Sequence, residues 1–173
     1  LSKLFKLKEW LILEEAANRI SNVLGEPVTL ADIYRLALDK HLTLSVDFVN
    51  GAQARTGKFV KTEDIEFAVF DKMPLTEEKL DKPLSIPLNA EIQCSKDDWI
   101  RLDKEVVSIR GLWDLTMMGA EQLDIEHYYQ QETSGLEVTL QALDGVFLKQ
   151  GDVLCQLQTD FDDNEYQQGS KAQ

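Results

Sequence analysis

The sequence predicts an α+β fold, in which two N-terminal helices and a β-hairpin precede a mainly β, acidic second half with one helix. Two observations lead to this prediction. Apolar side chains recur at helical spacing before residue 40 and then alternate with a period of two. The net charge changes sign near residue 61. Residues 1–61 hold nine Lys and Arg against seven Asp and Glu, a net +2, whereas residues 62–173 hold nine against twenty-four, a net −15.

The first helix is predicted over residues 9–24. Glu14 and Glu15 lie in its first turns, where acidic side chains favour the helix dipole. Gly25 ends the pattern and Pro27 follows, as is typical of a helix C-terminus. The apolar stripe that would face a core consists of Ala16, Ala17, Ile20, Val23 and Leu24.

The second helix is predicted to begin after Thr29. Thr29 suits the N-cap position, and Asp32 stands three residues later, where its carboxylate would complete a capping box. Arg35 and Lys40 are expected to stay exposed, and His41 follows the end of the helix. The buried face is expected to comprise Ile33, Leu36 and Ala37.

A strand and a basic hairpin are predicted next. Residues 42–49 alternate between apolar and polar side chains, which is typical of a strand with one buried face. Asn50 and Gly51 form a turn signal, and the return strand would begin near residue 59. The segment 48–62 contains no acidic residue, so its loop would suit phosphate oxygens. Its cationic side chains are Arg55, Lys58 and Lys61.

The second half is less regular, and its elements are predicted from shorter patterns. Three prolines punctuate a loop-rich stretch between residues 74 and 87. The predicted elements, in order, are a strand at 65–70, one or two helical turns at 97–102, short strands at 106–109 and 112–115 around Gly111, a helix at 120–132, a hairpin of 136–143 and 146–148 with its turn at Asp144 and Gly145, a strand at 153–157, and a frayed tail at 160–173.

The order helix, turn, helix, strand and basic hairpin is that of a winged helix-turn-helix module. The segments concerned are Trp10-Leu-Ile-Leu-Glu-Glu-Ala-Ala17, Val28-Thr-Leu-Ala-Asp-Ile-Tyr-Arg-Leu-Ala37 and Leu42-Thr-Leu-Ser-Val46. They resemble the small winged helix-turn-helix domains of excisionase and MerR-type regulators, and also the opening of a group of uncharacterised bacterial proteins. The resemblance covers residues 10–62 and implies a DNA-associated regulatory or accessory protein.

The resemblance implies that double-stranded DNA would be contacted by the second helix and the wing. The candidate contact residues are Tyr34, Arg35, Arg55, Lys58 and Lys61. Ile12 departs from the pattern, because the family usually has a Thr cap there, and loss of such a cap costs about 1 kcal/mol. The second helix also offers few side chains for reading bases. The net charge of −13 means that attraction to DNA would depend on a local patch.

Residues 1–62 are predicted to form the helix-turn-helix and wing module, and residues 63–173 an acidic, mainly β domain.

Composition gives further bounds on the class of protein. Cys94 and Cys155 are too few for a disulfide framework or a closed zinc site, which favours reduced thiols and a cytoplasmic location. No apolar run approaches the roughly 18 residues that a membrane span needs. Neither a metal nor a cofactor is expected.

Two other functional classes stay open. In the first, the helix-turn-helix is a scaffold in a protein-interaction module, whose acidic face meets a basic protein partner or whose body forms a homodimer. Such a module would not retain DNA. In the second, the protein is an enzyme, which would need a pocket that gathers His127, Asp124 and Cys94. The sequence contains no phosphate-binding loop and no evident nucleophile–base pair, so a non-enzymatic role is expected.

Overall fold

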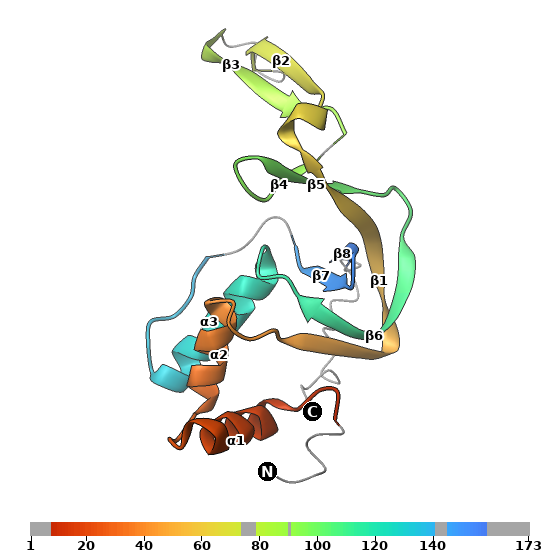
Figure 1. The fold of residues 1–173 in the computed structure, drawn as a ribbon. Coiled ribbons are helices and arrows are strands. Elements are labelled where there is room, and N and C mark those ends of the chain that lie inside the picture. Colours follow the sequence, from red (N-terminus) through yellow and green to blue (C-terminus); the bar gives the residue numbers. More distant parts are fainter. Residues whose placement is uncertain (1–7, 74–78, 90, 141–144, 159–173) are drawn as a thin grey trace.

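The computed structural model describes residues 8–73, 79–89, 91–140 and 145–158. It has an α+β architecture with a helical layer, a six-stranded sheet and a separate two-stranded sheet (Figure 1). The helices lie together below and to the left of the sheet in this view, and the two-stranded sheet stands at the opposite end of the molecule. The coarse fold class predicted from the sequence is therefore confirmed.

Helix α1 spans Leu13–Leu24, so the predicted helix begins four residues later than expected. Ile12 occupies the N-cap with extended backbone and makes no side-chain cap, which agrees with the missing Thr. Gly25 ends the helix in the left-handed conformation at φ 76°, and its N–H donates to the Ser21 carbonyl. The Ser21 hydroxyl then accepts from the N–H of Val28, which fixes the turn into the next helix.

Helix α2 spans Leu30–Leu38, and the predicted capping box is confirmed. The Thr29 hydroxyl accepts from the N–H of Asp32 at 3.2 Å, and the Asp32 carboxylate accepts from the N–H of Thr29 at 2.7 Å. The carboxylate of Asp32 accepts from both the N–H and the hydroxyl of Thr29, and these two hydrogen bonds lower the pKa of Asp32. Ile33 and Ala37 are fully buried, as the helical spacing predicted.

The predicted late helix is also confirmed, as α3 at Ala120–Thr133. Its N-cap, Gly119, has no side chain; the first N–H of the helix, that of Ala120, donates to the Gly145 carbonyl, and the buried carboxylate of Glu121 binds groups just before the helix. Glu121 Oε1 accepts from the Thr116 hydroxyl and from the N–H groups of Met118 and Gly119. Its Oε2 accepts from the N–H of Phe147, so one side chain joins the helix start to a strand.

The predicted hairpin at Asn50 and Gly51 is wrong, because Ser45–Lys61 forms one long strand, β1. β1 pairs antiparallel with β6 (Val107–Leu115) on both sides of residue 51, and the register shifts between Phe48 and Ala52. Gly51 has φ +86° at this irregularity, so the turn signal marks a bulge in a continuous strand. The basic segment is therefore not the loop of a wing.

β1 is one strand of a closed ring. Strands β7 (Phe147–Gln150) and β8 (Val153–Leu157) form a hairpin; β7 also pairs with β6, and β8 pairs with β1. The order β1–β6–β7–β8 thus returns to β1. All four strands contribute to one buried cluster, which comprises Ala54, Ile109, Trp113, Leu148 and Cys155.

The predicted boundary at residue 62 runs through this sheet. β1 comes from the first predicted module, yet all of its partners come from the second. Residues 97–102, expected to be helical, instead form β5 (Asp98–Leu102), because β5 pairs with residues 57–61 of β1. β4 (Ile92–Gln93) extends the same sheet beside β5. The two halves therefore fold as one sheet.

Other predictions in the second half are partly confirmed. β8 matches the predicted strand 153–157, whereas the two short strands around Gly111 are the single strand β6. Residues 136–140 are irregular, and residues 141–144 of the predicted hairpin lie outside the described residues. The predicted frayed tail likewise lies outside them. The actual hairpin, β7–β8, turns at Gly151 with φ +59°.

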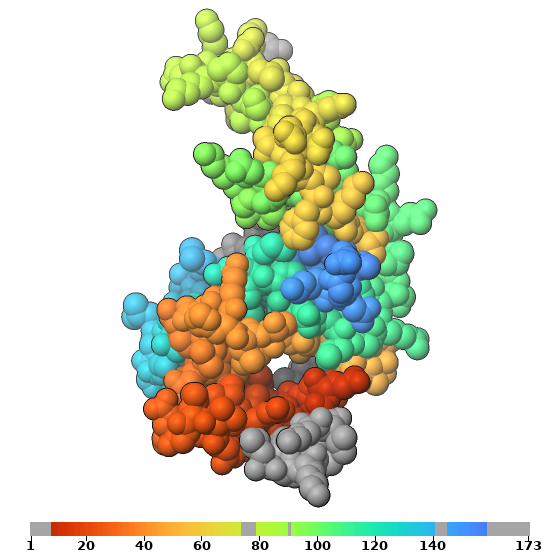
Figure 2. Space-filling view, viewed as in Figure 1, coloured from red at the N-terminus to blue at the C-terminus, as the bar shows by residue number. Residues whose placement is uncertain are grey.

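A two-stranded arm completes the fold. β2 (Phe67–Lys72) and β3 (Lys79–Pro87) pair antiparallel, after a short 3₁₀ turn at Thr62–Asp64. The arm leaves the end of β1 and points away from the helices and the ring (Figure 1). The space-filling view shows it as a yellow-green projection above the body (Figure 2). We use the name arm for residues 65–73 and 79–89.

Candidate functional site

Tyr34 lies in α2, where it was predicted to be a DNA-contact candidate. Only 8% of it is exposed, and its ring stacks on Tyr128 of α3 with the centroids 5.8 Å apart. Burial raises the pKa of Tyr34, and nearby charges such as that of Glu132 add to the effect. Tyr34 is therefore a packing residue between two helices and does not present its ring to a ligand.

Arg35, the next candidate, is exposed on α2. Its Nε donates to Asp39 Oδ2 at 2.8 Å, in an ion pair between residues four positions apart on one helix. The acidic partner offsets the local positive charge. An anion would have to compete with Asp39 for Arg35, although such an exposed ion pair contributes little energy.

Arg55 lies in the half of β1 that pairs with β8. Its Nε donates to the carbonyl oxygen of Asp103 at 2.6 Å, and the Asp103 carboxylate accepts from the hydroxyl of the neighbouring Thr56 at 2.6 Å. Arg55 thus fastens the β5–β6 connection to β1. Part of its hydrogen-bonding capacity is already used within the protein.

Lys61, at the end of β1, forms an ion pair with Asp98 of β5, with Nζ 2.6 Å from Oδ1. The hydrogen bond and charge of Asp98 raise the pKa of Lys61. In turn, the hydrogen bonds from Lys61 and Ser95 lower the pKa of Asp98. The two pKa shifts are opposite in direction and both favour the charged forms, so Asp98 balances the positive charge of Lys61 within the protein.

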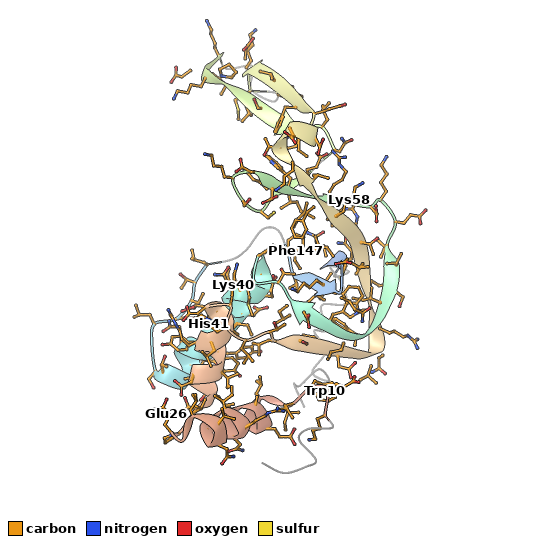
Figure 3. All side chains as sticks on the ribbon, in the orientation of Figure 1. Trp10, Glu26, Lys40, His41, Lys58 and Phe147 are labelled. Atoms are coloured by element: carbon orange, nitrogen blue, oxygen red, sulfur yellow. The ribbon has the colours of Figure 1, made fainter. Side chains whose placement is uncertain are left out.

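Lys58 is the exception among the five candidates, because it is exposed and makes no hydrogen bond or ion pair within the described part of the chain. Its cross-strand neighbour on β5 is Arg101. Side chains alternate along a strand, so Lys58 points to the face of β1 opposite to Arg55 and Lys61. Figure 3 places Lys58 on the upper half of β1, well separated from Lys40 and His41 at the end of α2.

The structure therefore divides the five predicted residues. Two lie on α2 and three on β1, the three on β1 point to two faces, and three of the four cations have a partner within the protein. A base-reading helix flanked by a phosphate-binding wing is not the arrangement found, since the wing segment is a strand inside the sheet.

Of the three residues considered for an enzyme, Asp124 and His127 lie three positions apart on α3, whereas Cys94 comes from a different part of the fold. Cys94 follows β4, and its Sγ donates to the carbonyl of Asp98 at 3.2 Å. His127 lies on α3, where Nε2 is 2.8 Å from the side-chain nitrogen of Gln131. Burial and the charge of Asp98 raise the pKa of Cys94, which disfavours a thiolate. Within the residues that are placed, no group of three metal-binding side chains gathers.

The arm was only half predicted from the sequence, because the predicted strand 65–70 overlaps β2 whereas β3 was expected to be a loop. At its base, the Trp99 ring of β5 meets Phe67 edge-to-face with the centroids 5.5 Å apart, and its Nε1 donates to the Thr62 hydroxyl. Ile65, two residues before Phe67 in the sequence, is also buried. The base of the arm is thus held by aromatic packing together with a hydrogen bond.

A buried carboxylate also anchors the arm. Glu91 accepts from Arg101 at 2.9 Å and from the N–H of Asn89 at 3.1 Å, and Arg101 also donates to the carbonyl of Asp64. Burial alone would raise the pKa of Glu91, but the hydrogen bonds outweigh it and lower that pKa. Arg101 therefore ties the entry and the exit of the arm to β5.

Farther out, the arm exposes apolar side chains. Paired positions place Ala68, Phe70, Leu84 and Ile86 on one face of the two strands. Leu84 and Ile86 are 38% and 40% exposed, and Val69 on the other face is 64% exposed. A signal for this region was present in the sequence, because residues 67–70 are all apolar. The second strand was missed because Pro83 and Pro87 indicated a loop, although prolines are tolerated in edge strands.

No family model, curated protein or solved structure matches this chain. The resemblance to winged helix-turn-helix regulators therefore stays a prediction. Among the helices that the structure describes, none has the length and apolar character needed to cross a membrane.

Proposed function

We propose that this chain is a non-enzymatic protein-interaction module, which contacts its partner through the arm. The observation that supports this is the uncovered apolar surface of β2 and β3. A two-stranded sheet is marginally stable in water by itself, and stable sheets gain further strands or a packed layer. Here the ring and the helices lie away from the outer arm and cover neither face (Figure 1).

The pairing of the cations argues in the same direction. A DNA-binding surface needs several cations that face one polyanion together. Arg35 and Lys61 have acidic partners, and Arg55 is hydrogen-bonded to a backbone carbonyl. In the interaction module, the helix-turn-helix segment serves as a scaffold that packs α2 against α3.

The experiment is site-specific photo-crosslinking in the cells that produce the protein. A photoreactive amino acid replaces Val69 on the arm or, as the matched control, Val23 on α1. Both valines are almost equally exposed, at 64% and 63%. We expect a discrete protein adduct from position 69 and none from position 23. Equal adducts from both positions, or none from position 69, would contradict the proposal.

A second candidate function is DNA association, and the observation in its favour is that Lys58, exposed beside Arg101, has no bonded partner among the described residues. It predicts that duplex DNA is retained at low salt and that Lys58→Ala weakens retention. A regulatory or accessory role would then depend on the face of β1 that carries Lys58. The acidic body would have to stay clear of the duplex.

A further inference from the structure

Among the strands that the structure describes, only β3 pairs with β2, so the outer edge of β2 has main-chain groups without a partner strand there. The carbonyl of Glu66 accepts from the N–H of Leu88 at 2.9 Å, so Glu66 directs its backbone toward β3. The direction of the backbone N–H and C=O groups alternates from one residue to the next along an antiparallel strand. Phe67, opposite Pro87, and Val69 therefore direct their backbone groups away from β3. Proline has no N–H, which is consistent with this assignment at the Phe67–Pro87 pair.

The two edges of the arm differ in their capacity to accept another strand. β3 carries Pro83 and Pro87, which remove donors, and proline is one of the devices that block edge-to-edge pairing. β2, which spans Phe67–Lys72, contains neither proline nor glycine. The edge that can be extended is therefore the edge of β2.

We infer that β2 pairs antiparallel with β2 of a second copy of this chain, in a two-fold arrangement centred on Val69. This inference rests on the proposed interaction function and names the partner. In that register Phe70 lies opposite Ala68 of the second copy, which keeps the apolar face continuous across four strands. The same register places Lys72 opposite Glu66 of the second copy, and the two-fold axis repeats this pair of opposite charges.

The side chains at the ends of β2 are free to make these contacts. Glu66 and Lys72 are exposed, and neither forms an ion pair with any other residue that the structure describes. The arm projects beyond the body, so paired arms hold the two bodies apart (Figure 2). The net charge of −13 on each chain is screened over about 8 Å at physiological salt.

The test is sedimentation velocity on the purified full chain at increasing concentration. We expect a dimer of twice the 19.7 kDa chain mass, and we expect Val69→Pro to abolish it by removing the central outward N–H. Ser85→Pro is the matched control, since Ser85 stands directly opposite Val69 on β3 and faces the other edge. It should leave the dimer intact. A wild-type chain that stays monomeric, or equal losses in both variants, would overturn the inference.

A charge exchange checks the register without proline. Glu66→Lys or Lys72→Glu alone places like charges opposite each other twice per dimer, and we expect the dissociation constant to rise about tenfold. The double variant Glu66→Lys/Lys72→Glu restores opposite charges and should return the constant to within about threefold of wild type. Failure of the double variant to recover would contradict this register.

The two proposals fail in different ways. An adduct from position 69 at the mass of two copies, together with a dimer in sedimentation, supports both. An adduct of a different mass with a monomeric purified chain overturns the second copy as partner but keeps the interaction module. Absence of any adduct from position 69, with a monomeric chain, overturns both proposals.

Discussion

The carboxylate of Glu91 accepts from the guanidinium of Arg101 at 2.9 Å, at the base of the arm. No part of the Glu91 side chain is exposed, whereas Arg101 remains one-third exposed. Because Arg101 also donates to the carbonyl of Asp64, this pair joins the chain segments that precede and follow the arm. The buried negative charge of Glu91 thus acts together with the Trp99–Phe67 contact in positioning the candidate interaction surface.

The first prediction concerns the pH dependence of the Glu91–Arg101 ion pair. The pKa of Glu91 is lowered from its ordinary value of 4.5 in the folded protein. Its stabilising contribution is therefore complete above pH 4.5 and is lost as the pH falls through the lower folded value. We expect the fluorescence of Trp99, which contacts the arm, to change over this acid range.

The control for this prediction is Glu91→Gln, which removes the titrating group and keeps the side-chain size. Its Trp99 fluorescence should already resemble that of the acid form at neutral pH and should change less below pH 4.5. Other carboxylates, such as Asp98, also have lowered pKa values, so the difference between the two proteins is the quantity to measure. Identical acid profiles would refute the role given to Glu91.

The second prediction tests the burial of Tyr34. Truncation of a buried aromatic side chain removes packing against Tyr128, and Tyr34→Ala should lower the free energy of unfolding by about 3 kcal/mol. Tyr128→Ala should cost less, because Tyr128 is 49% exposed. Chemical denaturation of both variants measures the difference. A nearly neutral Tyr34→Ala variant would mean that the ring is free to act elsewhere.

These residues show what local sequence signals could establish. The Thr29 and Asp32 cap and the start of α2 were predicted correctly, because the interacting groups are three residues apart. Tyr34 was placed on the exposed side because its partner, Tyr128, is remote in sequence. Helical spacing in α2 gives no information about the helix that covers it.

The strands illustrate the same limit over longer distances. Asn50 and Gly51 have the composition of a hairpin turn, but β6 supplies a partner on both sides and converts the turn into a bulge. Pro83 and Pro87 suggested a loop, yet β3 is an edge strand that needs no outward donor at those positions. Closure of the ring by β8 pairing with β1 has no local signature at all.

The third prediction concerns Glu121, which was not singled out from the sequence. It is 2% exposed and accepts four hydrogen bonds at the start of α3. Glu121→Ala leaves buried donors without an acceptor, so we expect a loss of about 3 kcal/mol in thermal or chemical unfolding. Glu132→Ala, an exposed change at the other end of α3, should stay within about 0.5 kcal/mol of wild type. Equal effects of the two changes would contradict this role for Glu121.

The fourth prediction separates the two candidate functions. Three of the four candidate cations are bonded within the protein, and the body is strongly acidic, so we expect no retention of duplex DNA in a gel shift at low salt. Lys58→Ala should then change nothing, and neither should Arg35→Ala on α2. A shift that weakens steeply with salt and disappears in Lys58→Ala but persists in Arg35→Ala would instead support DNA association through β1, because Lys58 is the one of these cations without a bonded partner in the described part of the chain.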